Sequence, residues 1–383
     1  MLHDLQVVEF AGVLAGPSAG MFLAELGASV VKIEPPGGDV TRSWKLGSED
    51  PAADRPAYFC SVNWGKRSLA LDLRQPEAQQ IALQLCRQAD IVLSSFIPGA
   101  AARLGLDADT LLRLNPRLIC AEINGYGPDV PRAAYDAIIQ AEAGFTYLNG
   151  LPGQIFKMPV ALMDVLAAHQ LKEAILLALL RRIRTGRGGR VSVSLLQAGV
   201  SALVNQAGNW LTARHLPQPI GSEHPNIVPY GTLFMTAGGQ PVVLAVGTDA
   251  QFAALCGVLG LPQRPEFSSN VQRVQRRREV GEWLQQAMAR QERDALLAAL
   301  LDRQVPAGAV HSMAEVFALP QAQALVLESD GLAGVRNAAA EGLELVPADE
   351  LLPPPALGAH TREILAGLGI DPEPLLASGA ARG

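Results

Sequence analysis

The stretch LQVVEFAGVLAGPSAGMFLAELGASVVKI, residues 5–33, decides the fold. Residues 5–10 form a short apolar run typical of a strand, residues 18–26 have a helical pattern, and residues 29–33 are rich in β-branched side chains. The alternation continues with a helix over 76–88, a strand over 91–94, a helix over 107–114 and a strand over 118–123. This rhythm predicts the α/β class, with an open, mostly parallel, Rossmann-like sheet that has helices on both faces.

Three loops of this first part follow predicted strands. They are residues 11–17, 95–99 and 124–127. Ligands of open α/β sheets bind beyond the carboxyl ends of the strands, so we expect these loops to share one binding edge. Their glycines and prolines also suit ordinary tight turns. In the first loop, small residues open a helix directly after a strand, which would let an anion or acyl group approach the backbone N–H groups.

Size and composition set the frame for the rest of the chain. With 383 residues, of which 49% are hydrophobic, the chain exceeds one usual core, so we expect one large and one smaller domain. The formal net charge of −6 argues against a general nucleic-acid surface and leaves room for a local basic pocket. The N-terminal residues resemble neither a signal nor a transit peptide, and the longest apolar run is too short for a bilayer. We therefore expect a cytoplasmic protein with no membrane partner.

The cysteine pattern gives no sign of a metal centre. Cys60, Cys86, Cys120 and Cys256 are widely separated, with no CxxC pair and no histidine at ligand spacing. We expect reduced thiols, no disulfide and no metal.

The second half of the chain suggests a smaller α+β domain. Strands are predicted over 232–235, 242–246 and 307–311, and helices over 250–258 and 280–301. The proline-spotted residues 217–229 and the run LPPPA, residues 352–356, resemble linkers. The predicted order is a large domain over 1–216, a linker over 217–230, a small domain over 231–335, a linker over 336–356, and a return to the large domain over 357–383.

Asp164 is the residue with the strongest chemical interest. It is the only carboxylate in MPVALMDVLAAHQ, residues 158–170, where a long apolar helix begins that runs to about residue 184. An aspartate at a helix start often caps the first turn. The partial positive charge of the helix N-terminus also suits a carboxylate that stays ionised near neutral pH and attacks an electrophilic carbonyl. The residue pattern alone leaves both roles open.

Several further motifs, together with Asp164, resemble one family along nearly the whole chain. The chain resembles the class III CoA-transferases, the CaiB/BaiF family. The shared segments are VVEF (7–10), AGP (15–17), LGASVVKIE (26–34), GGD (37–39) with Arg42, NWGKRS (63–68), ADIV (89–92), Phe96 with PG (98–99), LNPRL (114–118), GYG (125–127), AYD (134–136), TGRG (185–188), PY (229–230) and GAHT (358–361).

The resemblance implies an architecture and an activity. Members of the family form a homodimer in which two chains interlock like rings. They move CoA from an acyl-CoA to a carboxylic acid, with coenzyme A entering as part of the substrate. In the family an aspartate takes the acyl group as a mixed anhydride and then becomes an aspartyl-CoA thioester. Asp164 stands at the position of that aspartate, so the resemblance assigns it the nucleophile role.

The resemblance also suggests groups for the acyl pocket. Each tetrahedral intermediate needs N–H donors for its negative oxygen. The candidate donors are the backbone at Leu14, Ala15 and Gly16 and the loop 221–226 with His224. Tyr135 is expected to belong to the same acyl pocket. The chain departs from formyl-CoA transferase, which has glutamine at the position of Leu14 and a glycine-rich loop near 221–226. These departures speak against formyl or oxalyl specificity.

A second set of residues matches regions that contact CoA in relatives. Pro35 stands where the formyl-CoA enzyme has an arginine, so one cationic contact is missing. Any single lysine or arginine of the set could instead be a solvated or locally paired surface charge. The expected CoA-binding residues are Lys66, Arg67, Leu71, Arg74, Ser95, Phe96, Arg103 and Tyr135.

Other functions compete with the transferase. The related α-methylacyl-CoA racemases have a histidine where this chain has Tyr135, and a phenol ionises too rarely near neutral pH to shuttle protons well. His169 lies about 140° round the helix from Asp164 and fits a packing role better than a base. A non-catalytic acyl-CoA-binding paralogue is a third possibility. A nicotinamide-dependent dehydrogenase is a fourth, disfavoured because the first strand is not followed by GxGxxG.

For a transferase we expect small dicarboxylates such as succinate, since Arg132 and His224 could bind a distal carboxylate.

Overall fold

The computed structural model describes residues 1–383, which form two compact units. The first unit contains Met1–Ala143, Pro159–Val204 and Ala324–Gly383. The second contains Gly144–Met158 and Asn205–Gln323. No helix is both long enough and apolar enough to cross a membrane.

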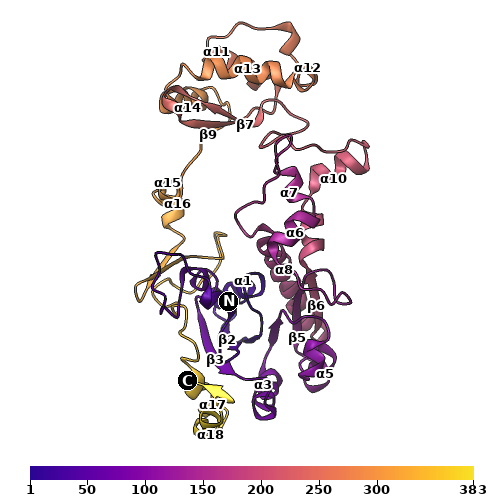
Figure 1. Ribbon diagram of the computed structural model, residues 1–383, viewed down its shortest axis with the longest axis vertical. Helices are drawn as coiled ribbons and strands as arrows, with labels where there is room; N and C mark the ends of the chain where they lie inside the picture. Colours follow the sequence, from indigo (N-terminus) through magenta and orange to yellow (C-terminus); the bar gives the residue numbers. More distant parts are fainter. The chain divides into compact units, whose positions relative to one another are not determined.

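A seven-stranded sheet organises the first unit (Figure 1). Its strand order is β12-β3-β2-β1-β4-β5-β6, and β1 to β6 pair in parallel, while the edge strand β12 is antiparallel to β3. The predicted open, mostly parallel sheet is therefore confirmed. The strands are β1 (Gln6–Glu9), β2 (Ser29–Glu34), β3 (Lys66–Leu71), β4 (Ile91–Ser94), β5 (Ile119–Asn124), β6 (Gly189–Ser194) and β12 (Ala381–Arg382).

Helices pack on both faces of the sheet because successive strand side chains point to opposite sides. One face carries an apolar core that includes Val8, Val31 and Leu69, and α3 (Pro76–Gln88), α5 (Ala108–Leu114) and α17 (Thr361–Gly367) contribute to this core. The other face is covered by α1 (Ala15–Glu25) and α8 (Leu162–Thr185), which pack against each other. The remaining helices of this unit are η1 (Val40–Ser43), α2 (Ala57–Cys60), α4 (Ala100–Arg103), α6 (Asp136–Glu142), α9 (Leu195–Ser201) and α18 (Pro372–Ser378).

The second unit has its own sheet and core. Its antiparallel strands are β7 (Tyr230–Met235), β8 (Pro241–Ala245) and β9 (Ala307–Ala309), in that order. Its apolar core includes Phe234, Leu255 and Leu284. Its helices are α7 (Phe145–Leu148), η2 (Ala237–Gly239), α11 (Asp249–Val258), η3 (Pro265–Phe267), α12 (Asn270–Gln275), α13 (Arg277–Met288), α14 (Arg293–Asp302), α15 (Met313–Phe317) and α16 (Pro320–Gln323). Helix α10 (Val204–Leu211) begins at the boundary between the units.

Several predicted elements differ from the structure. The helix predicted over 280–301 is two helices, α13 and α14, because the chain leaves the helix at residues 289–292. A similar break separates α9 from α10, where Val204 has a left-handed φ of 39°. Strand β3 and the hairpin of β10 (Val326–Ser329) with β11 (Leu332–Val335) were not predicted.

Candidate active site

A pocket of about 210 Å³ lies at the carboxyl edge of the first unit's sheet, where the loops after β1, β4 and β5 meet the starts of α1, α6 and α8. The three loops predicted to share a binding edge therefore do so. Asp164 lines the pocket from α8. Its other lining residues include Leu14, Ala15, Gly16, Ser95, Phe96, Asn124, Arg132 and Tyr135.

Asp164 is not the cap of its helix. It lies in the first turn of α8, whose N-cap residue, Ala161, makes no side-chain cap bond. The cap comes from α6, because the Asp136 carboxylate accepts the backbone N–H of Met163 at 2.9 Å. Gln140 donates to the other Asp136 oxygen at 2.8 Å and to the Val160 carbonyl at 3.1 Å. The capping role is thus filled by Asp136, and the carboxylate of Asp164 has no hydrogen-bond or ion-pair partner in the structure.

Burial and a nearby negative charge change the acidity of Asp164. The residue is 8% exposed. Desolvation first, and the charge of Asp136 second, raise its pKa from an ordinary 3.8 to about 7. Desolvation thus opposes the ionisation near neutral pH that the helix N-terminus was expected to favour. Near pH 7 the protonated and ionised forms coexist, and the ionised form is held without compensating contacts.

The start of α1 presents free backbone donors to the same pocket. Helix α1 has no side-chain cap at Leu14, and no protein group accepts from the N–H of Leu14, Ala15 or Gly16. The first N–H groups of any helix lack intrahelical acceptors. A Cβ at Gly16 would lie 2.3 Å from the Cβ of Ala11, so only glycine fits this approach of α1 to the loop. These donors and Asp164 line one pocket.

The predicted CoA-binding residues fall into separate groups. Ser95, Phe96 and Tyr135 line the pocket with Asp164, and Tyr135 is 56% exposed. Arg74 is exposed beyond β3, where it pairs with Asp72 at 2.8 Å. Arg103 lies in α4, next to Phe96 and its loop but outside the pocket lining. Their contacts with CoA stay a prediction.

Three members of the predicted set are placed where their side chains cannot meet a ligand in this pocket. Lys66 is fully buried, and its ammonium donates to Glu9, Asn63 and the Pro17 carbonyl. Leu71 is fully buried in the apolar core. Arg67 lies near the amino end of β3, where it donates to Ser29 and Glu363, at the edge opposite the pocket. Lys66 and Leu71 thus lie in the sheet interior and Arg67 at the far edge of the sheet, and the assignment of these three residues to CoA stays a prediction.

His224 belongs to the second unit. Its Nδ1 accepts the Asn226 N–H at 3.1 Å, and its ring packs edge-on against Tyr230 with centroids 5.3 Å apart. Arg277 holds the same loop through Glu223 at 2.7 Å and through the carbonyls of His224 and Pro225. The role of His224 in an acyl pocket stays a prediction.

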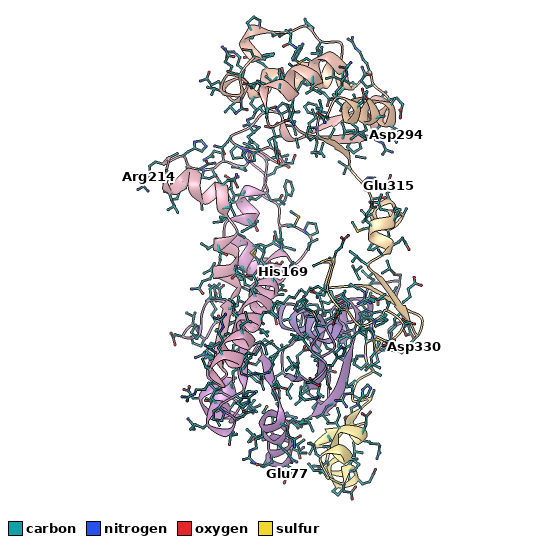
Figure 2. All side chains as sticks on the ribbon, turned by 180° about the vertical axis from the view of Figure 1, so that it is seen from behind. Glu77, His169, Arg214, Asp294, Glu315 and Asp330 are labelled. Carbon is teal, nitrogen blue, oxygen red and sulfur yellow. The ribbon has the colours of Figure 1, made fainter.

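The sequence patterns did not predict the role of Asp136 beside Asp164. Asp136 was quoted only as part of a motif. In the structure it caps α8, and its charge helps to raise the pKa of Asp164. The sequence gave no sign of this cap, because Asp136 and Met163 are 27 positions apart in the chain. His169 is exposed on α8, as Figure 2 shows, and is not among the pocket-lining residues. No group of three or more His, Cys, Asp or Glu side chains is arranged to hold a metal.

Comparison with known proteins identifies the class. The model of CoA-transferase family III matches residues 2–361. The succinate–glutarate CoA-transferase of Agrobacterium fabrum is 37% identical, covering 96% of this chain and 95% of the relative. The succinyl-CoA:glutarate CoA-transferase of Mus musculus is 33% identical, covering 95% and 85%. A crystal structure of a CaiB/BaiF family protein from Brucella suis superimposes with a TM-score of 0.82 at 35% identity, covering 95% and 98%.

The sequence and the fold are thus those of an acyl-CoA-dependent enzyme. The chain belongs to CoA-transferase family III, and its activity is CoA transfer with an acyl-CoA as substrate. This confirms the family resemblance and sets aside the dehydrogenase and the non-catalytic paralogue.

The raised pKa of Asp164 makes a stability prediction. A carboxyl group whose folded pKa lies above its unfolded value costs stability as pH rises from about 4 to about 7, after which the cost is constant. Asp164→Asn removes this cost, so at about pH 8 the variant should be more stable than the parent by up to about 4 kcal/mol. The gain should shrink as pH falls toward 5. Urea unfolding at both pH values measures it.

The matched control is Asp129→Asn, the same change at an exposed aspartate. It should leave the free energy of unfolding nearly unchanged at both pH values. An Asp164→Asn variant that is less stable than the parent at pH 8 would contradict the assigned cost of burial.

Proposed function

We propose that this CoA-transferase works through a covalent intermediate on Asp164. The observation that carries the proposal is a buried carboxylate without a partner, in a pocket that also contains three unengaged backbone N–H groups. A carboxylate with raised pKa and no competing hydrogen bonds is a better nucleophile than a solvated one. The adjacent donors suit the negative oxygen of a tetrahedral intermediate.

The proposed sequence balances at each step. The Asp164 carboxylate attacks the thioester carbonyl, and CoA leaves as a thiolate from the resulting acyl-aspartyl anhydride. The thiolate attacks the aspartyl carbonyl, which releases the donor acid and leaves an aspartyl-CoA thioester. The acceptor carboxylate attacks this thioester and forms a new anhydride while the thiolate leaves again. The thiolate then attacks the acceptor's carbonyl, and Asp164 returns as a carboxylate.

The proposed substrates are short dicarboxylic acids, with succinyl-CoA as a donor. The names of the relatives from Agrobacterium fabrum and Mus musculus support this choice, as both contain succinate or succinyl-CoA together with glutarate. Arg132 also supports it, because this arginine lines the pocket and its guanidinium pairs with Glu142 at 2.7 Å. A distal carboxylate could bind this guanidinium. The homodimer implied by the family resemblance belongs to the same proposal.

The covalent step can be tested by trapping. Incubation with succinyl-CoA followed by hydroxylamine should convert the Asp164 side chain to a hydroxamate, which mass spectrometry of the peptide detects. The Asp164→Asn protein and a sample without succinyl-CoA serve as controls and should give no adduct. An unmodified Asp164 peptide from an enzyme that turns over normally would reject the covalent route.

The acidity of Asp164 predicts the pH profile. Because the ionised form attacks, kcat/KM for the acyl-CoA should rise with pH through about 7. The Asp136 charge raises this pKa, so Asp136→Asn should move the rise to lower pH. The asparagine oxygen can still accept the Met163 N–H, which keeps the cap. A profile that does not move in the variant would show that another group controls the rise.

Arg132 predicts acceptor selectivity. Arg132→Leu should raise KM for glutarate at least about tenfold, the loss expected for one charge-assisted contact, while KM for a monocarboxylate of similar length changes little. Arg278→Leu is the control, because Arg278 is an exposed arginine that pairs with Glu282 in the second unit. Equal effects of Arg132→Leu on both acids would remove Arg132 from the selectivity site.

A further inference from the structure

Val13 has a backbone conformation that its side chain disfavours. Its φ is 68°, in the left-handed region, where a β-branched residue is a genuine outlier. Such conformations cost about 1 to 3 kcal/mol and persist only where the surroundings impose them. Val13 directly precedes Leu14, Ala15 and Gly16, which line the pocket of Asp164 and whose N–H groups have no protein acceptor. The direction of those donors therefore depends on the conformation of Val13.

Three consecutive residues of this loop are held by side chains from other parts of the chain: Lys32 in β2, Asp39 at the start of η1 and Ser95 directly after β4. The Val13 N–H donates to both oxygens of Asp39, at 3.2 and 3.4 Å. The Gly12 N–H donates to the Ser95 hydroxyl at 3.1 Å. The carbonyl of Ala11 accepts from the Lys32 ammonium at 2.7 Å. Two of these holding side chains are charged, which makes their hydrogen bonds stronger than neutral ones.

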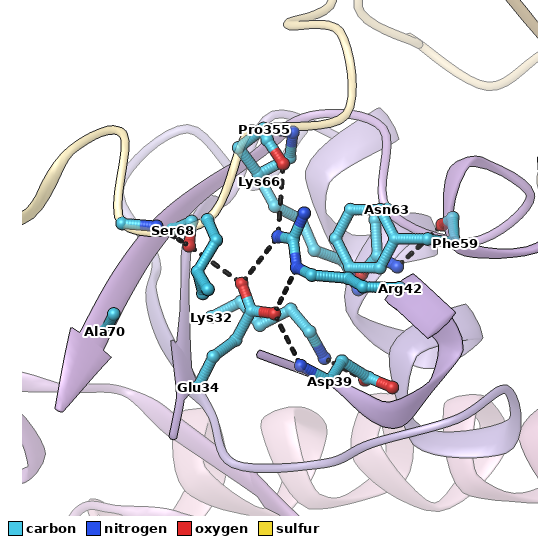
Figure 3. Close-up of polar contacts among 12 residues, drawn as sticks. Lys32, Glu34, Asp39, Arg42, Phe59, Asn63, Lys66, Ser68, Ala70 and Pro355 are labelled. Atoms are coloured by element: carbon cyan, nitrogen blue, oxygen red, sulfur yellow. Dashed lines mark hydrogen bonds and ion pairs between the residues drawn. The ribbon is translucent and has the colours of Figure 1, made fainter. Parts of the chain in front are cut away.

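Asp39 and Lys32 belong to a balanced cluster of buried charges between the sheet and α1. Lys32 pairs with Asp39 at 3.0 Å and with Glu9 at 3.2 Å. The cluster contains three carboxylates and three cations, each nearly inaccessible to solvent: Glu9, Glu34, Asp39, Lys32, Arg42 and Lys66. Figure 3 shows Glu34 between Arg42 and Asp39, with Lys66 beyond them.

The charged cluster is bonded to the backbone on two sides, at Asp39 and at Pro17. Burial would raise the pKa of Asp39, but the Lys32 ammonium and the Thr41 N–H and hydroxyl outweigh it and lower that pKa below the ordinary value. Glu34 accepts from the Asp39 backbone N–H at 3.0 Å, and Lys66 donates to the Pro17 carbonyl of α1 at 2.8 Å. Strand β2, the turn after it and the first turn of α1 are thereby joined through charges that cannot move into water.

We propose that Asp39 is a positioning residue for the transferase reaction: by accepting the Val13 N–H it holds Val13 in the left-handed conformation and so aims the N–H groups of residues 14–16 at the pocket. The inference rests on the proposed role of these donors beside Asp164. Asp39 does not line the pocket, and it acts only through Val13. The AGP (15–17) and GGD (37–39) segments of the sequence give no sign that Asp39 holds Val13.

The test is a loss and a rescue. Asp39→Ala should lower kcat at least about tenfold with a small change in KM for succinyl-CoA, since misdirected oxyanion donors cost about 100-fold in known cases. Val13→Gly alone should stay within about threefold of the parent, because glycine adopts positive φ without strain. The double variant Asp39→Ala/Val13→Gly should recover most of the lost kcat. A purely structural role for Asp39 predicts the opposite, as added glycine flexibility further destabilises a weakened protein.

The control is Glu25→Ala, which removes another buried carboxylate of the first unit, near the C-terminal end of α1. Glu25 accepts the N–H groups of Asn337 and Ala338 at 2.8 and 2.7 Å, and it has no hydrogen bond to Asp39 or to residues 11–16. Its loss should therefore leave kcat within about threefold of the parent at temperatures where the variant is folded. An equal loss in both variants, or no recovery in the double variant, would overturn the positioning role.

A second pair of variants keeps the test valid if Asp39→Ala does not fold. Val13 is partly exposed, so its substitution disturbs little of the core. Val13→Pro fixes φ near −65° and should lower kcat at least about tenfold, whereas Val13→Gly should not. Native kcat in Val13→Pro would overturn the inference. Failure of the Asp164 proposal is recognised separately, by Asp164→Asn retaining transfer activity whatever happens at Val13.

Discussion

The desolvated carboxylate of Asp164 is the constraint around which the carboxyl edge of the sheet is arranged. Burial and the nearby Asp136 charge raise its pKa to about 7, which corresponds to a cost of about 4 kcal/mol for the ionised form. Acylation removes that charge, so the same burial that destabilises the free carboxylate favours its conversion to an anhydride or thioester. Asp136 contributes twice, because it caps α8 and thereby frees Asp164 from the capping role.

A reactive carboxylate needs a rigid frame, and the fold supplies one from charges as well as apolar packing. The sheet has an apolar core on the face of α3 and α17, whereas the face beneath α1 contains the six-charge cluster. Buried ion pairs often contribute little net stability, yet breaking one is costly, so they fix geometry strongly. Gly20 allows this arrangement, since a Cβ there would overlap the Glu9 carboxylate. Val13, with its strained backbone, is bonded to this cluster through Asp39.

Sequence patterns predicted the architecture where local signals were strong. The apolar runs of β1, β2, β4 and β5 and the long helix α8 were found close to their observed bounds. Strand β3 was missed because it begins with Lys66 and Arg67, and the burial of Lys66 depends on Glu9, a partner 57 residues away. The single predicted helix over 280–301 was wrong because helical propensity continues through residues 289–292, whereas in the structure the chain turns there and the Glu292 side chain caps α14.

Part of the site could be predicted because the positions of its loops follow from the strands, whose local sequence signals are strong. Loops at one sheet edge follow from strand order, so the loops that contain Leu14, Ser95 and Asn124 were correctly predicted to meet at one edge. The acidity of Asp164 and the strain at Val13 arise from Asp136 and Asp39, which reach them only through the folded chain. The surroundings of basic residues could not be predicted, because a lysine in a motif, such as Lys66, does not reveal whether it faces solvent or a buried glutamate.

The most direct test of the central claim follows an oxygen atom. If Asp164 carries CoA as a thioester, the acceptor's carboxylate must leave one of its oxygens on the Asp164 side chain. Reaction with succinyl-CoA and glutarate labelled with a heavy oxygen isotope should therefore place the label in the Asp164 peptide, and a further turnover should pass it to released succinate. Rapid transfer of CoA with the Asp164 peptide and the released succinate both unlabelled would contradict the covalent account.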